Sequence, residues 1–218
     1  MNIELGIGDV TSALEGGSRV LLMMRHAERP HIDHEDPTFG ADLPITPAGV
    51  AAAEALGARL AGFADSVQFF SSPLRRTRLT AHHVAEGMGV GARWNIDTIP
   101  LDGRLGNESF YFADQLKVWE LFRGGEFFRL IFEYIEKGEL EGFRPLDEAS
   151  RMLEDFVVER FTGRLGIFTT HDLYNGAFLK SRGAWDSWTV ENWVGFLDSA
   201  AIFISPDGSR RYALVRSR

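Results

Sequence analysis

Three short apolar runs constrain the possible folds of this chain more than any other feature. They predict buried strands at residues 19–24, 67–71 and 165–170, and each run ends abruptly in polar residues. Helices are expected between them: Thr46 can cap a helix that has Pro47 in its first turn, a second helix is expected from Pro73 to Glu86, and a third follows from Leu173 to Ser181. Strands that alternate with helices indicate an α/β fold with a mostly parallel sheet.

The remaining segments complete a single predicted domain, residues 1–218. Residues 1–18 contain several glycines with little periodicity and are interpreted as an irregular leader, and residues 94–99 are predicted to form another strand. Residues 102–160, rich in aromatic side chains, are predicted to form a small helical cap inserted between two strands. The segments 200–205 and 211–215 flank a Pro-Asp-Gly turn and predict a closing β-hairpin, which makes the sheet mixed.

Composition limits the classes of function. The chain has 218 residues, no cysteine and a formal net charge of -8. The lack of cysteine excludes disulfides, thiolate metal sites and cysteine nucleophiles, and the acidic balance argues against nucleic acid as a partner. No apolar run has the length of a membrane span and the N-terminus lacks the features of a secretory signal, so no membrane association and a cytoplasmic location are expected.

The polar residues after the three strands form a plausible catalytic set. The first strand is followed by Arg25 and His26, the second by a segment that contains Arg76, and the third by His171 and Asp172. If these strands are neighbours, the side chains converge in the crevice at the carboxyl ends of the strands. Arginines can bind phosphate oxygens in pairs, an imidazole can attack phosphorus, and a carboxylic acid can protonate the leaving oxygen. The set is typical of phosphoryl transfer without a metal, and no cofactor is expected.

Four motifs in sequence resemble those of the histidine phosphatase superfamily, which includes phosphoglycerate mutases and histidine acid phosphatases. The motifs are Arg25-His26-Ala27, the helix start at residues 43–49, the Ser-x-Leu-x-Arg-x-x-x-Thr-Ala segment at residues 72–81, and His171. The resemblance implies a three-layer α/β/α sandwich, a nucleophilic histidine at His26, a phosphate-binding arginine at Arg76 and a second active-site histidine at His171.

Two residues favour the acid-phosphatase type of site within this resemblance. Arg29 lies where that type has a further phosphate-binding arginine, and Asp172 matches the aspartate of its His-Asp pair, which is the proton donor. A helix N-terminus and nearby arginines lower the pKa of a carboxyl, whereas a bound phosphate dianion would raise it. In the mutase type a glutamate after the strand that corresponds to residues 94–99 donates the proton, and here Asp102 and Glu108 are the nearest candidates.

The sequence leaves several alternatives open. A mutase would use the same phosphohistidine but return the phosphoryl group to a sugar acid. A phospho-ligand-binding module that has lost turnover would fit Ala27, which replaces the signature glycine and would impair turnover if that position required a positive φ. Residues 31–36 contain closely spaced histidines and carboxylates that could chelate a divalent ion, although a solvated loop explains them better.

The sequence thus predicts a metal-independent phosphatase that hydrolyses a phosphate monoester through a phosphohistidine on His26. Arg25, Arg29 and Arg76 would bind the phosphate, His171 would stabilise the transferring group and Asp172 would donate the proton. The expected partner is a small-molecule phosphate ester or a phosphoprotein, with a phosphate- or sulfate-like anion in the site. The sequence does not identify the substrate or the oligomeric state, but the aromatic cap suggests a partly apolar entrance.

Overall fold

A mixed six-stranded sheet forms the centre of the computed structural model, which describes residues 2–32, 36, 38 and 40–218. The strands are β1 (Glu4–Gly6), β2 (Arg19–Arg25), β3 (Val67–Ser71), β4 (Leu165–Thr170), β5 (Ser199–Ile204) and β6 (Arg210–Arg216), in the order β1-β6-β5-β2-β4-β3. β5 runs antiparallel to both of its neighbours, and the other pairs are parallel. The predicted mixed, mostly parallel α/β sheet is confirmed, as is the hairpin formed by β5 and β6.

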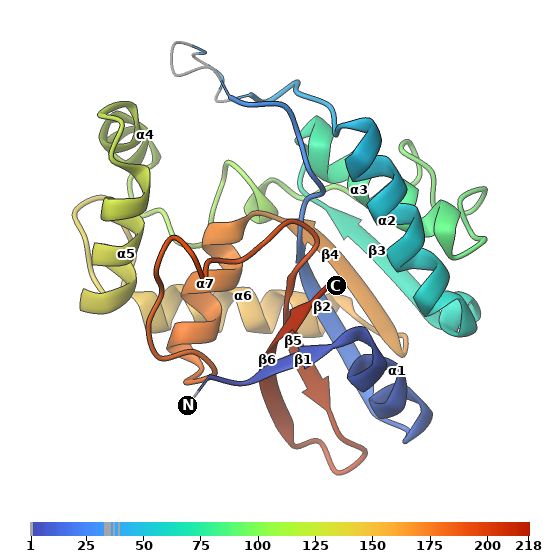
Figure 1. Ribbon diagram of the computed structural model, residues 1–218. Coiled ribbons are helices and arrows are strands. Elements are labelled where there is room, and N and C mark those ends of the chain that lie inside the picture. The colour runs from blue at the N-terminus through green and yellow to red at the C-terminus, as the bar shows by residue number, and fades with distance from the viewer. Residues whose placement is uncertain (1, 33–35, 37, 39) are drawn as a thin grey trace.

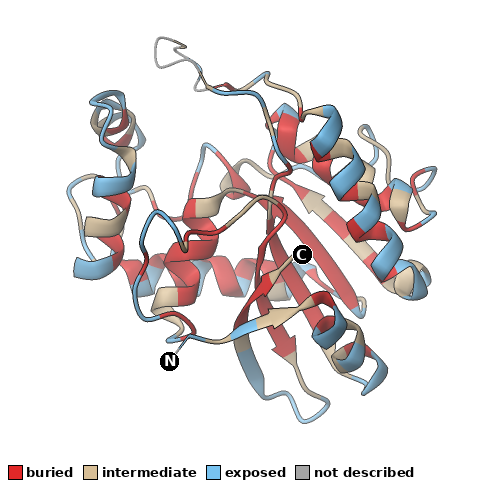
Figure 2. Ribbon diagram, viewed as in Figure 1, coloured by how far each residue is buried: buried red, intermediate tan, exposed pale blue. Residues whose placement is uncertain are grey.

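Helices cover both faces of the sheet, so the fold has three layers (Figure 1). On one face lie α1 (Ile7–Glu15), α2 (Pro47–Leu60) and α3 (Arg75–Gly87), and on the other lie α6 (Leu146–Arg160) and α7 (Asp172–Ser181). The side chains of β2 alternate between two cores: Leu22 packs with the first group of helices, and Leu21 and Met23 pack with the second. Figure 2 shows the resulting buried centre, with exposed residues on the outer helix faces.

Two helices stand apart from the sheet beyond α7, at the left of Figure 1: α4 (Gln115–Arg123) and α5 (Phe127–Lys137). Asp114 caps α4 through a bond from the Lys117 N–H, and Gly138 ends α5 with a φ of 75°, a conformation that glycine adopts readily. The predicted cap at residues 102–160 also includes α6, which packs against α7. The boundaries of the cap stay a prediction.

Helices α2 and α3 approach each other closely through glycines. Thr46 caps α2 by accepting a hydrogen bond of 3.0 Å from the Gly49 N–H, with Pro47 at the first position, as predicted. A Cβ on Gly57 would lie 2.1 Å from the Val84 carbonyl oxygen, and one on Gly87 would lie 2.0 Å from the Glu54 carbonyl oxygen. Because no side chain fits there, the two backbones are in direct contact.

Three local predictions were wrong. The segment 1–18 was expected to be an irregular leader, but residues 4–15 form β1 and α1, with Ile7, Val10 and Leu14 buried at helical spacing despite the flanking glycines. Residues 94–99 form turns instead of a strand, because the Asn95 side chain accepts bonds from two following backbone N–H groups.

The third wrong prediction concerns the start of α3, which begins at Arg75 instead of Pro73. The Ser72 hydroxyl does not cap that helix; it lies 2.7 Å from the Thr77 hydroxyl. Two short 3₁₀ segments, η1 (Ala61–Ser66) and η2 (Gly103–Leu105), connect the longer elements. Among the described residues, no helix combines the length and apolar character that crossing a membrane requires.

Candidate active site

The three predicted strand ends meet at one edge of the sheet. β4 lies between β2 and β3 and pairs in parallel with both, so Arg25 is opposite Thr170, and Ser71 is opposite Thr169. The residues that follow each strand therefore emerge side by side. Arg25, His26, Arg29, Arg76, His171 and Asp172 all line a single pocket.

His26 is held rigidly at the floor of this pocket. Its backbone N–H donates to the Thr170 carbonyl at 3.1 Å, and its Nδ1 lies 2.8 Å from the Ala27 carbonyl oxygen. Only 4% of the residue is exposed, and its ring centroid is 5.6 Å from that of His171. The contact at Nδ1 requires a proton on that nitrogen, which leaves the lone pair of a neutral ring on Nε2.

Burial and nearby positive charges lower the pKa of both histidines. Burial lowers the pKa of His26 well below its ordinary 6.5, and the positive charges of Arg76, Arg25 and Arg29 lower it further. Burial and Arg76 have the same effect on the pKa of His171. His171 also contacts the Ser72 hydroxyl, at 3.4 Å from its Nε2.

The pocket arginines retain donors that the protein does not satisfy. Arg76 donates to the Gly40 carbonyl at 2.7 Å, and Arg29 donates to the Pro30 carbonyl at 2.8 Å. Among the described residues, however, the buried Nε atoms of Arg25, Arg29 and Arg76 have no hydrogen-bond partner. Burial, together with the charge of Arg29, lowers the pKa of Arg76 to about 10, which still leaves it charged at neutral pH. Clustered cations with unsatisfied donors are suited to a polyvalent anion.

Asp172 stands at the N-terminus of α7 and is tied to three donors. Its carboxylate accepts hydrogen bonds from the Leu173 backbone N–H at 3.0 Å and from the Trp193 indole N–H at 3.1 Å. It also forms an ion pair with Arg25 at 3.0 Å. Burial alone would raise the pKa of Asp172, but Arg25 and the Trp193 indole outweigh it and hold the pKa below the ordinary value. Asp172 is thus ionised while Arg25 remains its partner.

The two other carboxylates considered as proton donors do not line the pocket. Asp102 caps η2 and forms ion pairs with Arg104 at 2.9 Å and Arg160 at 3.0 Å. Glu108 lies against Gly103, where a Cβ would contact its carboxylate at 2.5 Å. Of the described residues that line the pocket, Asp172 is the only carboxylate.

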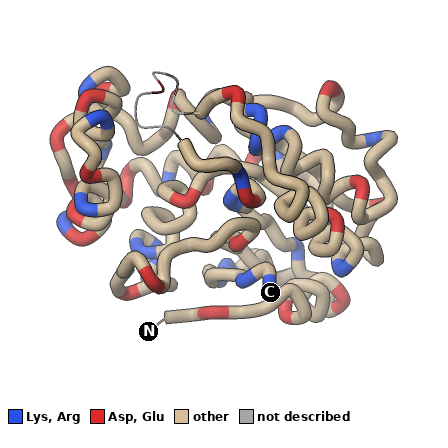
Figure 3. Tube along the Cα trace, turned by 45° about the horizontal axis from the view of Figure 1, so that its top comes forward, with Lys and Arg blue, Asp and Glu red and all other residues tan. Residues whose placement is uncertain are grey.

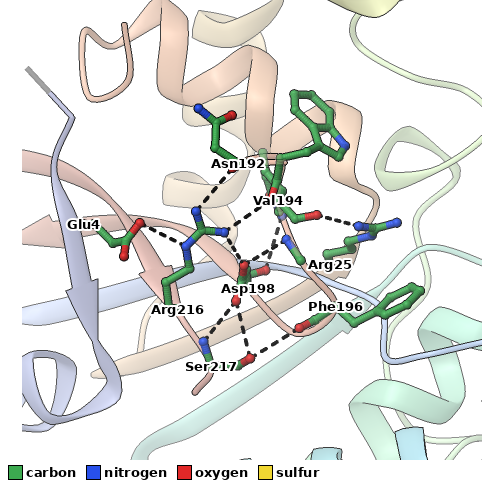
Figure 4. Close-up of polar contacts among 11 residues, drawn as sticks. Glu4, Arg25, Asn192, Val194, Phe196, Asp198, Arg216 and Ser217 are labelled. Atoms are coloured by element: carbon green, nitrogen blue, oxygen red, sulfur yellow. Dashed lines mark hydrogen bonds and ion pairs between the residues drawn. The ribbon is translucent and has the colours of Figure 1, made fainter. Parts of the chain in front are cut away.

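Sequence reasoning missed a loop at residues 189–198 that supports the pocket (Figure 4). Arg25 donates to the Val194 carbonyl, and its guanidinium lies 4.5 Å from the centre of the Phe196 ring. The same loop supplies Trp193, the indole partner of Asp172. These contacts are made by a backbone carbonyl and by isolated aromatic residues, which no spacing in the sequence marks.

Buried Asp198 anchors that loop. It accepts hydrogen bonds from the Gly195 N–H at 2.8 Å, from Arg216 at 2.7 Å and from the Ser217 N–H at 3.0 Å, as Figure 4 shows. Its backbone carbonyl accepts from the Arg25 N–H at 2.9 Å. The network connects the end of β6 to the end of β2, directly beneath Arg25.

Ala27 fits the site without strain. Its methyl group is fully buried in the core under α2 and α3, and its N–H donates to the Thr80 hydroxyl at 2.9 Å. Among the described non-glycine residues, only Leu197 has a positive φ. The conformation of residue 27 therefore does not require the glycine of the signature.

The proposed chelating segment at residues 31–36 is described only in part, since Asp33, His34 and Glu35 lie outside the described residues. Within the described part of the chain, no group of three or more histidine and carboxylate side chains has the arrangement of a metal site.

Part of the sequence matches the model of a known protein family. Residues 21–98, which contain three of the four motifs, match the family model described as histidine phosphatase superfamily (branch 1). No curated protein matches the sequence. The acid-phosphatase type of site is not confirmed and stays a prediction.

Solved structures share the fold. Phosphoserine phosphatase from Entamoeba histolytica, in complex with phosphoserine, has a TM-score of 0.58 at 15% identity, covering 91% of this chain and 98% of that one. For phosphoglycerate mutase from Bacillus anthracis, the TM-score is 0.57 at 17% identity, with 92% and 95% covered. Residues 21–98 thus match the model of the histidine phosphatase superfamily, and the α/β fold of the whole chain is similar to that of these solved mutase and phosphatase structures.

Proposed function

We propose that this protein is a phosphatase that hydrolyses a phosphate monoester without a metal, through a phosphohistidine on His26. The observation that carries the proposal is the convergence of two histidines and three arginines with unsatisfied donors in one pocket. The arginines would neutralise the phosphate oxygens, which is the role that metal ions have in other phosphoryl-transfer enzymes.

The protonation states support His26 as the nucleophile. An imidazole attacks phosphorus only in its neutral form, and burial lowers the pKa of His26 well below 6.5. With the Nδ1 proton held by the Ala27 carbonyl, Nε2 is the attacking atom. The N–P bond forms as the ester P–O bond breaks, and His171 stabilises the charge of the transferring group.

Asp172 is the proposed proton donor to the leaving oxygen. When a phosphate dianion binds the arginines, it competes for Arg25 and adds negative charge near Asp172, and both effects raise the pKa of the carboxyl. The acid would thus form with the substrate in place. Water then attacks the phosphohistidine, which releases inorganic phosphate and regenerates neutral His26.

The substrate proposed is a small-molecule phosphate ester. Related folds crystallise with such ligands: one solved structure of phosphoserine phosphatase contains phosphoserine, and another contains 3-phosphoglyceric acid. These structures, each 15% identical to this chain, support a small phosphate ester as the class of substrate proposed here.

Trapping the intermediate is the decisive experiment. The protein is mixed for milliseconds with p-nitrophenyl phosphate labelled at phosphorus and quenched in base, and the label is expected on His26 as acid-labile, base-stable phosphate. Inorganic phosphate should accumulate in the presence of a strong chelator, and without transfer to an added sugar acid.

The His26→Asn variant is the matched control, since its amide preserves much of the side-chain volume. It should retain the melting temperature of the native protein while losing the label. Turnover that survives in this variant, or folded native protein that hydrolyses no ester, would refute the proposal.

A further inference from the structure

The pocket is much larger than a phosphate group requires. Its volume is about 550 Å³, in the range of sites for organic ligands, and the two histidines and three arginines of the predicted catalytic set form only part of its lining. Its outer wall is aromatic: α4 contributes Trp119 and Phe122, α5 contributes Phe127 and Phe128, and Phe112 comes from the segment before α4. This wall is where the alcohol part of an ester would lie.

The rings of this wall pack against one another in a continuous series. Trp119 lies 6.0 Å from Phe122, Phe122 lies 5.0 Å from Phe127, and Phe127 lies 5.6 Å from Phe128, measured between ring centroids. Phe128 in turn lies 6.4 Å from Trp193, whose indole bonds to Asp172. The apolar wall therefore reaches the carboxylate next to the proposed leaving oxygen.

Phe128 is the most informative member of the wall. It is 40% exposed, and among the described residues it is the only phenylalanine, tyrosine or tryptophan with so large an exposed fraction. When a ligand covers an apolar ring at the rim of a pocket, the buried apolar surface makes the free energy of binding more favourable. Trp119, which is partly exposed, faces the same pocket from α4.

We propose that the preferred substrates are phosphate monoesters whose alcohol carries an aromatic or compact apolar group close to the phosphate. This inference rests on the proposed function, because it concerns the same pocket. Among the described residues that line this pocket, the charged or ionisable side chains other than Arg25, His26, Arg29, Arg76, His171 and Asp172 are His31, Arg123 and Tyr174, so few charges on the wall compensate for burying a charged alcohol.

Esters with similar leaving groups test the preference. Benzyl phosphate, ethyl phosphate and glycerol 3-phosphate all release alkyl alcohols, so differences in chemical reactivity are small. We expect kcat/KM for benzyl phosphate to exceed the other values by at least about tenfold, a typical gain for filling an apolar pocket. 3-Phosphoglycerate, with a carboxylate that can pair with Arg123, is the contrasting substrate. Equal kcat/KM values for all four esters, or a higher kcat/KM for 3-phosphoglycerate, would overturn the inference.

Binding of phosphonates separates this inference from the proposed chemistry, because phosphonates bind without being hydrolysed. Benzylphosphonate should bind at least about tenfold more tightly than methylphosphonate in calorimetry. The advantage should largely disappear in Trp119→Ala and Phe128→Ala, and Phe128→Leu should restore part of it. Met152→Ala, a partly exposed position on α6 away from the pocket, should leave it unchanged. If the benzyl advantage survives in both alanine variants, the wall does not select the substrate, whatever the rate of hydrolysis.

Discussion

Replacing Asp172 with asparagine tests the proposed proton donor most directly. The amide has nearly the shape of the carboxylic acid and keeps one oxygen as an acceptor, but it cannot supply a proton. The substitution also removes the ion pair of 3.0 Å with Arg25, in which both side chains are 15% exposed. Two separable effects should follow, one on the chemical step and one on phosphate binding.

The size of the chemical effect should depend on the leaving group. Benzyl alkoxide needs a proton as it leaves, and general acid catalysis contributes about 10²- to 10⁴-fold, so kcat should fall by that factor. p-Nitrophenolate leaves without a proton, so its kcat should fall by less than about tenfold, a change of roughly 1.4 kcal/mol. Because Arg25 loses its carboxylate partner, KM should not rise for either ester.

Inorganic phosphate release from both esters, measured for native and variant protein at pH 6 to 7, gives the required ratio of rates. The control variant is Asp97→Asn, whose side chain is 87% exposed and pairs only loosely with Arg78 at 3.8 Å. Asp172→Asn and Asp97→Asn should have the same melting temperature. If Asp172→Asn slows both esters by the same factor, Asp172 positions Arg25 but does not protonate the leaving group.

Three further perturbations have defined outcomes. Gly57→Ala should lower the free energy of unfolding by about 1–3 kcal/mol, because its Cβ would lie 2.1 Å from a backbone oxygen of α3; an unchanged urea midpoint would contradict the close helix contact. Burial lowers the pKa of His26, so the folded state resists protonation of this side chain. The contribution of neutral His26 to the free energy of unfolding is present above pH 6.5 and is lost below it, by up to about 1.4 kcal/mol per pH unit. His26→Gln should therefore flatten the fall in stability that urea titrations measure from about pH 7 to 5. Burial raises the pKa of Asp172, while Arg25 and the Trp193 indole lower it; Trp193→Phe should therefore shift the alkaline limb of kcat to higher pH, and an unshifted limb would argue against this acid.

The sequence was most informative where a short run of residues determines both the type of element and whether it is buried. β2, β3 and β4 were predicted because buried strands in a parallel sheet are continuous apolar runs. The polar residues at their ends then had to meet once the strands were neighbours, which the strand order confirms. The capped start of α2 at Thr46 was equally local, since one hydroxyl bonds to a backbone N–H three residues later.

What the sequence could not predict depends on contacts between distant segments. Trp193, Val194 and Phe196 support Asp172 and Arg25 from a loop without periodicity, and only the folded chain brings them there. The cap aromatics were noticed as a class, but which of them face the pocket depends on how α4 and α5 are oriented. The helix α1 was missed because glycines on both sides concealed its three buried residues.

The anchoring of Asp198 by Arg216 has a consequence for how the protein matures. A nascent chain gains the histidines and the three arginines long before β6 emerges, yet Arg25 and Asp172 acquire their supports only when residues 193–217 have folded onto the sheet. Ribosome-bound intermediates that stop short of residue 216 would thus contain every proposed reacting group while lacking the geometry that makes them competent.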